Sequence, residues 1–547
     1  MPIKRRSLLS AVAFAAAPRT AWAQALSRGV FTHGVASGDP LPDGVVIWTR
    51  FTGETLRWEV AEDVRFTHIA QSGEAHASLA NDFCVKVDVR SLAPGRPYFY
   101  RFLSATESSP VGQTRTAPAD GGERLRIALF SCANLPFGYF HAYADAAQRD
   151  DIDLVLHVGD YIYEMPRGSY PSAAEAVPGR VIDPVRTASS LSDYYLRYAS
   201  YHADPALLEL RRTKPLATVW DDHELVNNAW RAGSPNHSVT YQGEYSARVA
   251  AAAKAYFDWM PIRAPGPLQL YRYLDWGDLA RIVLLDARYI GRDQQVSFRD
   301  AIAPLLAQGG DEARAAAADF RRTVLDDPAR SMLGAAQEEW LARTLAQSKQ
   351  RGQPWQILAQ QVIVGDQIAP RDITRLFSET LSSSSRQWFS SGAELASLGL
   401  AWNLDAWAGY PASRHRLLDA CAQHAKNALI LAGDSHNCWL NNLPAASGSR
   451  LAAIEFATGS VTSPGFERSL TLAAPGERES LFRAANPNLA WCDITHRGYA
   501  TLTFTRAICE AEWRAVNDVR APGANPPAIT RFVAAASEAS GPGGWVT

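Results

Sequence analysis

Residue types that bind metal ions follow four apolar, strand-like segments of this sequence. In chain order they are Cys132 and Asn134 after segment 125–130, Asp160 and Tyr163 after 154–158, Asp222 and His223 after 216–220, and Asp434 and His436 after 428–432. Ligands of α/β sheets bind at the carboxyl ends of the strands. We therefore expect these side chains to meet in one crevice.

Each motif also has a purely structural interpretation. A Gly-Asp pair after a strand is a common turn, and Asp222 can cap a helix. His436 can be a surface histidine, and Cys132 can be a small buried apolar residue. Core packing, however, does not require acids and histidines at four successive strand ends. The recurrence of the pattern therefore favours a functional site.

The donor types suggest two different metal ions. A thiolate from Cys132 is a soft donor that does not suit magnesium or calcium, so Cys132 with Tyr163 and His436 indicates iron. The carboxylates of Asp222 and Asp434 suit a harder divalent ion such as calcium, and a carboxylate such as Asp160 can bridge two ions. Neighbouring ions lower the pKa of bound water and clamp a phosphoryl group. The set therefore predicts hydrolysis of phosphate esters.

The elements that must position these residues change in character near residue 118. Residues 31–116 contain short, β-branched runs without helical patterns, which favours a β-sandwich of about 85 residues. After a Pro/Gly-rich linker, apolar runs alternate with helical patterns at 243–259, 335–348 and 414–425. This alternation predicts a large, layered α/β or α+β domain. Segments 166–184 and 378–392 are interpreted as insertions, the second as a mobile loop.

The first 23 residues have the pattern of an export signal. Lys4, Arg5 and Arg6 precede the apolar run 7–16, and Ala21-Trp22-Ala23 has the form of a signal-peptidase site. The apolar run is too short to span a membrane. The paired arginines resemble a twin-arginine signal read by that export machinery, with an ordinary Sec signal as the alternative. We expect a periplasmic or secreted protein that begins near Gln24.

Composition and charge exclude other classes. The 547 residues are 47% hydrophobic and 20% charged, as in a folded globular protein, and no later stretch is apolar enough for a transmembrane anchor. The net charge of −2 gives no sign of a nucleic-acid partner. Six cysteines form no CxxC pair and no regular disulfide framework. We expect a monomer.

Six motifs together resemble a known family over nearly the whole mature chain. They are the stretch 31–40, Ser131-Cys132-Ala133-Asn134, Gly159-Asp160-Tyr161-Ile162-Tyr163-Glu164, Trp220-Asp221-Asp222-His223-Glu224, Gly433-Asp434-Ser435-His436-Asn437 and Ser460-Val461-Thr462-Ser463-Pro464-Gly465. The sequence is similar to the PhoD-like alkaline phosphatases, within the metallophosphoesterase superfamily. This resemblance implies a signal peptide at 1–23, a fibronectin-III-like β-sandwich at 24–118, an αββα catalytic domain at 119–515 and a tail at 516–547.

The resemblance also implies cofactors and an activity. It implies Fe3+ held by Cys132, Asp160, Tyr163 and His436, and Ca2+ held by Asp160, Asp222 and Asp434. Asn134 and His223 are expected to contact the phosphate or the leaving group. The implied activity is alkaline hydrolysis of phosphate mono- and diesters for phosphate acquisition outside the cytoplasm. No Gly-x-Ser-x-Gly motif is present, so we expect in-line attack by a metal-bound hydroxide without a phosphoenzyme, with His223 protonating the leaving oxygen.

Three positions depart from the family pattern, and other functions stay open. Leu135-Pro136 and Ala408 replace residues expected there, which concerns loop packing and substrate shape, and Gln361 is a further candidate metal contact. The nearest alternative is a phospholipase D-type or cell-envelope-polymer diesterase. A non-catalytic phosphate- or glycan-binding protein would lack a ligand residue. A disulfide-stabilised structural protein would need Cys132 oxidised.

Overall fold

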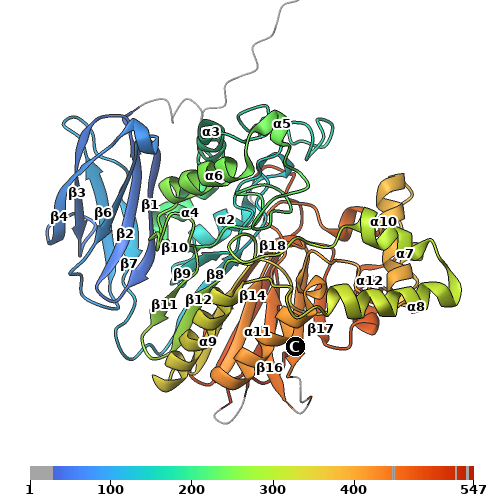
Figure 1. The fold of residues 1–547 in the computed structure, drawn as a ribbon. Helices are drawn as coiled ribbons and strands as arrows, with labels where there is room; N and C mark the ends of the chain where they lie inside the picture. The colour runs from blue at the N-terminus through green and yellow to red at the C-terminus, as the bar shows by residue number, and fades with distance from the viewer. Residues whose placement is uncertain (1–28, 446–447, 449, 524–526, 538–540, 547) are drawn as a thin grey trace, which may run out of the picture.

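The computed structural model describes residues 29–546 except 446–447, 449, 524–526 and 538–540. The predicted signal peptide and its cleavage site lie outside the described residues. A β-rich N-terminal part and a larger α/β part lie side by side (Figure 1). The expected fold class, a small β domain followed by a larger α/β domain, is thus confirmed.

The N-terminal part is a β-sandwich. One layer contains β1 (Phe31–Leu41), β2 (Gly44–Phe51) and β5 (Cys84–Val89), and the other contains β3 (Thr55–Ala61), β4 (Ile69–His76), β6 (Pro97–Leu103) and β7 (Gly112–Arg115). Val35, Ile47, Val60 and Tyr100 from the two layers are buried in one shared core. Along β6 the buried side chains of Tyr98, Tyr100 and Phe102 alternate with more exposed ones, as the two faces of such a sandwich require.

The sandwich shares a sheet with the larger α/β part. β1 pairs in parallel with β10 (Pro215–Thr218), so that Gly38 lies beside Leu216. A Cβ on Gly38 would come within 2.4 Å of the Leu216 carbonyl oxygen, which explains the glycine. Next to this contact Asp39 forms a buried ion pair with Arg272 at 2.8 Å. The two parts are therefore joined by backbone pairing as well as by the linker.

The resulting sheet has nine strands. Beyond β10 it continues through β9 (Leu154–His157), β8 (Leu125–Phe130), β18 (Arg497–Phe504), β19 (Ile508–Val516) and β20 (Ala528–Ala535). β8, β9 and β10 run parallel, so the residues after them gather at one edge. β20 pairs antiparallel with β19, which places residues 528–535 of the predicted C-terminal tail at the edge of this sheet. The domain boundaries themselves stay a prediction.

A seven-stranded sheet packs against the nine-stranded one. Its strands, in spatial order, are β11 (Arg272–Trp276), β12 (Ala280–Leu284), β13 (Trp355–Ala359), β14 (Asn427–Ala432), β16 (Leu451–Ala457), β15 (Cys438–Pro444) and β17 (Leu489–Asp493). Side chains of a strand alternate between its two faces. Accordingly, Ile357 and Leu429 join the core between the sheets, whereas Leu358 and Ile430 join the core beneath the outer helices.

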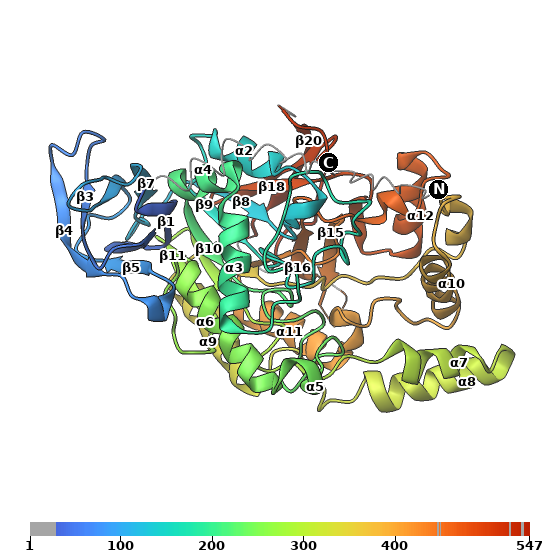
Figure 2. The same cartoon turned by 90° about the horizontal axis from the view of Figure 1, so that it is seen from above.

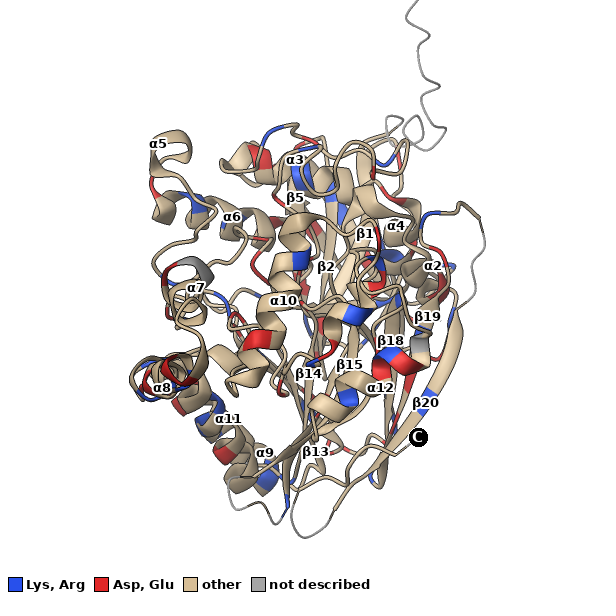
Figure 3. Ribbon diagram, turned by 90° about the vertical axis from the view of Figure 1, so that its right-hand side faces the viewer, with Lys and Arg blue, Asp and Glu red and all other residues tan. Residues whose placement is uncertain are grey.

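Helices cover both outer faces and complete an αββα sandwich (Figure 1). Over the nine-stranded sheet lie α2 (His141–Ala147), α3 (Leu191–His202), α4 (Pro205–Thr213) and α6 (Tyr245–Trp259), and over the seven-stranded sheet lie α9 (Ala335–Gln350) and α11 (Pro411–His424). Among the described residues, no helix is both long and apolar enough to cross a membrane. Basic and acidic residues are interspersed along helices such as α8 (Gly310–Phe320) and α11 (Figure 3).

The interpretation of segment 378–392 as a mobile loop is wrong. Most of it belongs to α10 (Ser383–Ser397), which lies with α7 (Ala303–Leu306) and α8 at the end of the molecule opposite the β-sandwich (Figure 2). The Ser382 side chain accepts a hydrogen bond from the Ser385 amide at 3.1 Å, so the serine run starts a helix. Leu395 of α10 packs with Leu305 of α7, and these long-range contacts stabilise a helix whose serines are weak helix formers.

Candidate metal centre

The loops after the parallel strands are hydrogen-bonded to one another. The Cys132 amide donates to the Gly159 carbonyl oxygen at 3.1 Å, and the Ala133 amide donates to the Asp160 carbonyl oxygen at 2.8 Å. These contacts fix the loops after β8 and β9 side by side. The convergence expected from the order of the strands is therefore present for these two segments.

Four of the predicted ligand residues have left-handed backbone conformations. The φ angles are 58° for Cys132, 54° for Asp160, 61° for Asp434 and 63° for His436. Residues other than glycine rarely adopt this region, and they do so at a cost of about 1–3 kcal/mol. Such strain persists where the surrounding structure dictates it, commonly at functional sites.

The first candidate ligand group lies around Asp160. The Asp160 Oδ2 atom is 3.4 Å from Cys132 Sγ and accepts a hydrogen bond from the Tyr163 hydroxyl at 2.9 Å. That hydroxyl is also 3.4 Å from His436 Nε2. Cys132, Asp160 and His436 offer ligand atoms that all lie within 4.8 Å of one another. The predicted iron ligands are thus brought together.

Neighbouring groups orient two of these side chains. His436 Nδ1 lies 2.8 Å from the Pro464 carbonyl oxygen, so Nδ1 carries the proton and Nε2 presents its lone pair to the group. Ser463 donates to the Tyr163 hydroxyl at 2.7 Å. Burial lowers the pKa of His436 to about 4, which keeps its imidazole neutral and able to bind a metal.

Burial disfavours the charged forms of the other donors. It raises the pKa of the Cys132 thiol and of the Tyr163 phenol well above their ordinary values, and the negative charge of Asp160 adds to both effects. The pKa of Asp160 itself is raised by burial. Bound positive charge would reverse these shifts, because a metal ion deprotonates a coordinating thiol outright. The donor set therefore suits a cation.

A second candidate group shares Asp160 and adds Asp222 and His223, again with ligand atoms within 4.8 Å of one another. Asp222 Oδ2 accepts a hydrogen bond from the Asn228 amide at 2.6 Å. Burial opposes ionisation of Asp222, but Arg288 and His223 outweigh it and lower its pKa to about 2. Asp222 is accordingly a carboxylate before any ion binds.

His223 is held by Glu164. Its Nδ1 lies 2.6 Å from Glu164 Oε2, and its ring packs against the Tyr163 ring with centroids 4.2 Å apart. Burial acts to lower the pKa of His223, but the carboxylates of Asp160, Glu164 and Asp222 raise it well above 6.5. In its protonated form His223 has no lone pair for a metal, so its Nε2–H is left to donate a hydrogen bond.

Asp434 belongs to neither group. Its Oδ1 accepts a hydrogen bond from Arg288 Nη2 at 2.5 Å, and the same nitrogen lies 3.9 Å from Asp222. Arg288 is fully buried, and it also donates to Asp221 and to Asp405. The sequence interpretation missed Arg288. Arg288 follows the apolar segment 280–285. Considering the residues after that segment, as was done for the other four, would have found Arg288.

Glu224 is a second residue that the sequence interpretation did not single out. Its carboxylate accepts backbone hydrogen bonds from Asp160 at 3.1 Å, Tyr161 at 2.6 Å and Asp221 at 2.8 Å. It thereby fixes the loops after β9 and β10 relative to each other. A Cβ on Gly159 would lie 2.4 Å from the Asp221 amide nitrogen, so this close packing requires glycine.

The side chains of Gln361 and Asn134, two predicted contacts, differ in whether their amide oxygens have hydrogen-bond partners. Gln361 uses its amide on backbone groups: Oε1 accepts from Ala287 at 2.9 Å, and Nε2 donates to Trp220 at 2.7 Å. It therefore braces the loops, and its amide oxygen is already occupied. Asn134 donates to the Tyr170 carbonyl oxygen at 3.3 Å, while its Oδ1 is buried and has no hydrogen-bond partner among the described residues.

Unsatisfied acceptors indicate where a cation fits. Buried polar atoms are normally hydrogen-bonded, yet Asp160 Oδ1 is buried without a partner in the described part of the chain. Cys132 is a free thiol beside it. The thiol of Cys132 and the phenol of Tyr163 thus contact Oδ2 of the carboxylate whose other oxygen is unpaired, and the imidazole of His436 lies beside the phenol. The residues present fit a bound metal ion.

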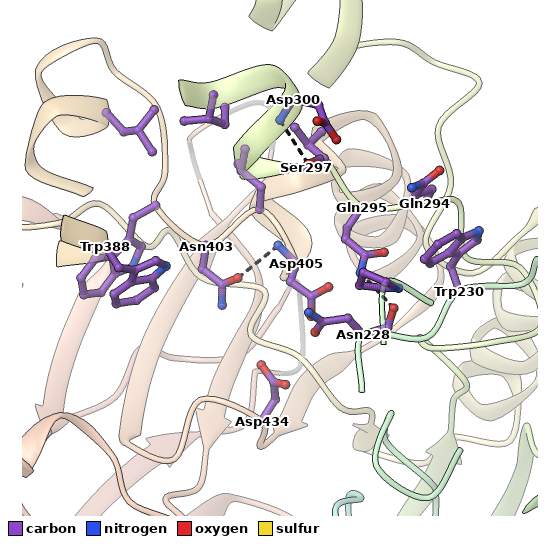
Figure 4. Close-up of a pocket in the computed structure, with 16 residues that line it drawn as sticks. Asn228, Trp230, Gln294, Gln295, Ser297, Asp300, Trp388, Asn403, Asp405 and Asp434 are labelled. Carbon is purple, nitrogen blue, oxygen red and sulfur yellow. Dashed lines mark hydrogen bonds between the residues drawn. The ribbon is translucent and has the colours of Figure 1, made fainter. Parts of the chain in front are cut away.

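A pocket of about 570 Å3 opens next to this centre. Asp434 lies at one side of the pocket, and residues from α10 and from the loops after β10 and β12 form its walls (Figure 4). The pocket and the predicted ligand set therefore meet at Asp434.

The fold and the site define a two-sheet α/β protein with a candidate metal centre at the strand ends, and known proteins share this arrangement. The model of the PhoD-like phosphatase family matches residues 127–513, and that of the PhoD-like phosphatase N-terminal domain matches residues 15–118. Alkaline phosphatase D from Bacillus subtilis (strain 168) is 32% identical over 518 residues, covering 90% of this chain and 79% of that protein. A solved structure of PhoD aligns with a TM-score of 0.73 at 30% identity, over 94% of this chain and 91% of that chain.

The chain therefore belongs to the PhoD-like phosphatase family. The resemblance inferred from the motifs is confirmed, and so is the expectation of a phosphoric ester hydrolase.

Proposed function

We propose that this protein is an exported, metal-dependent phosphoesterase that releases phosphate from mono- and diesters outside the cytoplasm. The observation that carries the proposal is the convergence of Cys132, Tyr163 and His436 on Asp160, whose Oδ1 has no hydrogen-bond partner among the described residues. Export rests on the sequence of residues 1–23.

The donor chemistry assigns an ion to each group. Ferric iron would be held by Cys132, Asp160, Tyr163 and His436, because thiolate, phenolate and imidazole together suit iron. Calcium would be held through oxygen atoms by Asp160 and Asp222 of the second group, together with Asp434, which lies outside that group. When bound, these ions would lower the pKa of water and neutralise charge on the phosphoryl group.

The protein's own residues supply the remaining steps. His223, kept protonated by Glu164 at 2.6 Å, donates its Nε2 proton to the leaving oxygen. Asn134 contributes its side chain to the phosphate site, since its Oδ1 is buried without a partner among the described residues. Hydroxide, formed when water of lowered pKa gives its proton to solvent, would attack in line with the leaving group, and no side chain would form a covalent intermediate.

The first experiment measures bound elements in protein purified without chelators. We expect near-stoichiometric iron together with calcium, and a visible absorption band from thiolate and phenolate bound to ferric iron. Cys132→Ala should lose the iron and the band. The matched control is Cys509→Ala, a buried cysteine of β19, which should keep both. Zinc or manganese without iron in active protein would contradict the iron assignment.

A further inference from the structure

The walls of the pocket beside Asp434 combine three tryptophans and other apolar side chains with an equal number of polar ones. Trp388 lies on one side and Trp230 on the other (Figure 4), and Trp402 stacks against Trp388. The side-chain amides of Asn228, Gln295 and Asn403 line the space between them. This mixture suits an organic group that has both an apolar face and polar substituents, because the polar side chains can fix its orientation.

The charged groups that line the pocket, among those whose side chains are described, are the carboxylates of Asp300, Asp405 and Asp434. Two of them are compensated from behind, because Arg288 pairs with both Asp405 and Asp434. The described lining therefore offers no attraction to a second anionic group on the substrate, and Asp300 would repel one.

The indole of Trp388 is partly exposed and offers a flat face on which a ring can stack. It projects from α10, and its side chain is 40% exposed. Its indole stacks on that of Trp402, with centroids 5.0 Å apart and an angle of 27° between the planes. Trp402 is only 8% exposed and is itself packed against Phe466 and Phe482. The supporting rings hold Trp388 in one orientation, so a ligand that stacks on it gives up little conformational freedom of the protein.

We propose that this pocket binds the alcohol part of the ester and that Trp388 selects alcohols carrying an uncharged, hydroxylated ring, such as a sugar. The apolar face of such a ring packs on the indole, and its hydroxyl groups meet the amides of Asn228, Gln295 and Asn403. This inference rests on the proposed function, because it requires the phosphate to sit at the centre next to Asp434.

The test compares three esters of primary alcohols, so that the reacting bond is matched. They are glucose 6-phosphate with a neutral ring, glycerol 3-phosphate without a ring, and 6-phosphogluconate with a carboxylate. Each is measured as an inhibitor of the hydrolysis of bis(p-nitrophenyl) phosphate, which reports binding whether or not the ester turns over. Wild type, Trp388→Ala and Trp388→Phe are compared with Tyr241→Ala, an 88% exposed aromatic outside the pocket lining.

We expect wild type to bind glucose 6-phosphate at least fivefold more tightly than either other ester. In Trp388→Ala the inhibition constants of glucose 6-phosphate and glycerol 3-phosphate should lie within twofold of each other. The inhibition constant of glycerol 3-phosphate should be the same as in wild type. Trp388→Phe should keep at least half of the preference, and Tyr241→Ala all of it. The inference would be overturned, and the proposed function left standing, by either of two results. Wild type could bind glucose 6-phosphate and glycerol 3-phosphate equally, or Trp388→Ala could weaken the binding of both by the same factor. Absence of diester and monoester hydrolysis in metal-loaded wild type would overturn the proposed function and this inference with it.

Discussion

Arg288 donates a hydrogen bond to Asp434 at 2.5 Å, and this contact joins the seven-stranded sheet's β12 loop to its β14 loop. The same guanidinium reaches Asp221 and Asp405, so one buried cation serves three carboxylates. Unpaired buried charges are costly, and removing one partner of a buried pair typically costs about 3–5 kcal/mol. Arg288 therefore allows the acidic centre to fold before metal ions arrive.

Replacing Arg288 with Met should destabilise the protein and impair catalysis. We expect unfolding free energy to fall by about 3–5 kcal/mol and kcat to fall about 100-fold or more, because Asp221 and Asp434 lose their counter-charge, whereas Asp405 keeps its ion pair with Arg292. Denaturant unfolding and initial rates measure both. The matched control is Arg314→Met on α8, whose ion pair with Asp311 is exposed, and it should change stability by less than about 0.5 kcal/mol. If Arg288→Met changes neither the unfolding free energy nor kcat appreciably, the role given to Arg288 is refuted.

Gly159→Ala should disturb the site through the backbone. The φ angle of Gly159 is 106°, and an added Cβ would approach the Asp221 amide to 2.4 Å. We expect a loss of about 3 kcal/mol or more, together with loss of activity, because the loops after β9 and β10 must separate. Gly179→Ala is the control, since its φ is 82° but no atom lies within 4 Å of the added Cβ. It should cost about 1 kcal/mol, the backbone penalty alone.

Glu164→Gln should change the pH dependence of catalysis. The carboxylate of Glu164 helps to raise the pKa of His223, against the effect of burial. If His223 is the general acid, kcat is lost as pH rises through this pKa. Removing the charge lowers the pKa, so the basic limb of the kcat profile should move to lower pH by at least about one unit. His223→Gln should abolish the basic limb of the kcat profile. If this limb stays at the same pH in Glu164→Gln, a residue other than His223 is the general acid.

Stability should fall on the acid side of neutrality because of His157. Burial lowers its pKa to about 3, while Nδ1 accepts from the Gly159 amide at 3.3 Å and Nε2 contacts the Tyr143 hydroxyl at 2.9 Å. A depressed pKa contributes stability that is complete above the unfolded value near 6.5 and is lost as pH falls. At pH 5 this loss amounts to about 2 kcal/mol.

The test is the unfolding free energy of wild type and His157→Gln at pH 7.5 and pH 5. The variant should lose less stability between the two pH values, by about 2 kcal/mol, because an amide does not titrate in this range. His68→Gln provides the comparison, since the His68 side chain is 79% exposed, and it should behave like wild type. An identical pH dependence in all three proteins would contradict the assignment to His157.

Local pattern was enough to find the strands that carry the site. Segment 125–130 coincides with β8, and segments 154–158 and 216–220 overlap β9 and β10. These strands are buried on both faces, so they appear in the sequence as continuous apolar runs. The helix α10 was missed because its serines favour loops locally, whereas the contacts of Leu395 and Phe389 that stabilise it are distant in sequence.

The sequence by itself determined which residues end the strands, and therefore that Cys132, Asp160 and His436 would share one edge of the sheets. The tertiary structure alone decided how they are held. Arg288 contacts carboxylates 67, 117 and 146 positions away, and Pro464 fixes the proton of His436 from 28 positions away. Such partners leave no periodic signal, because they become neighbours only when the two sheets pack face to face and bring distant loops together.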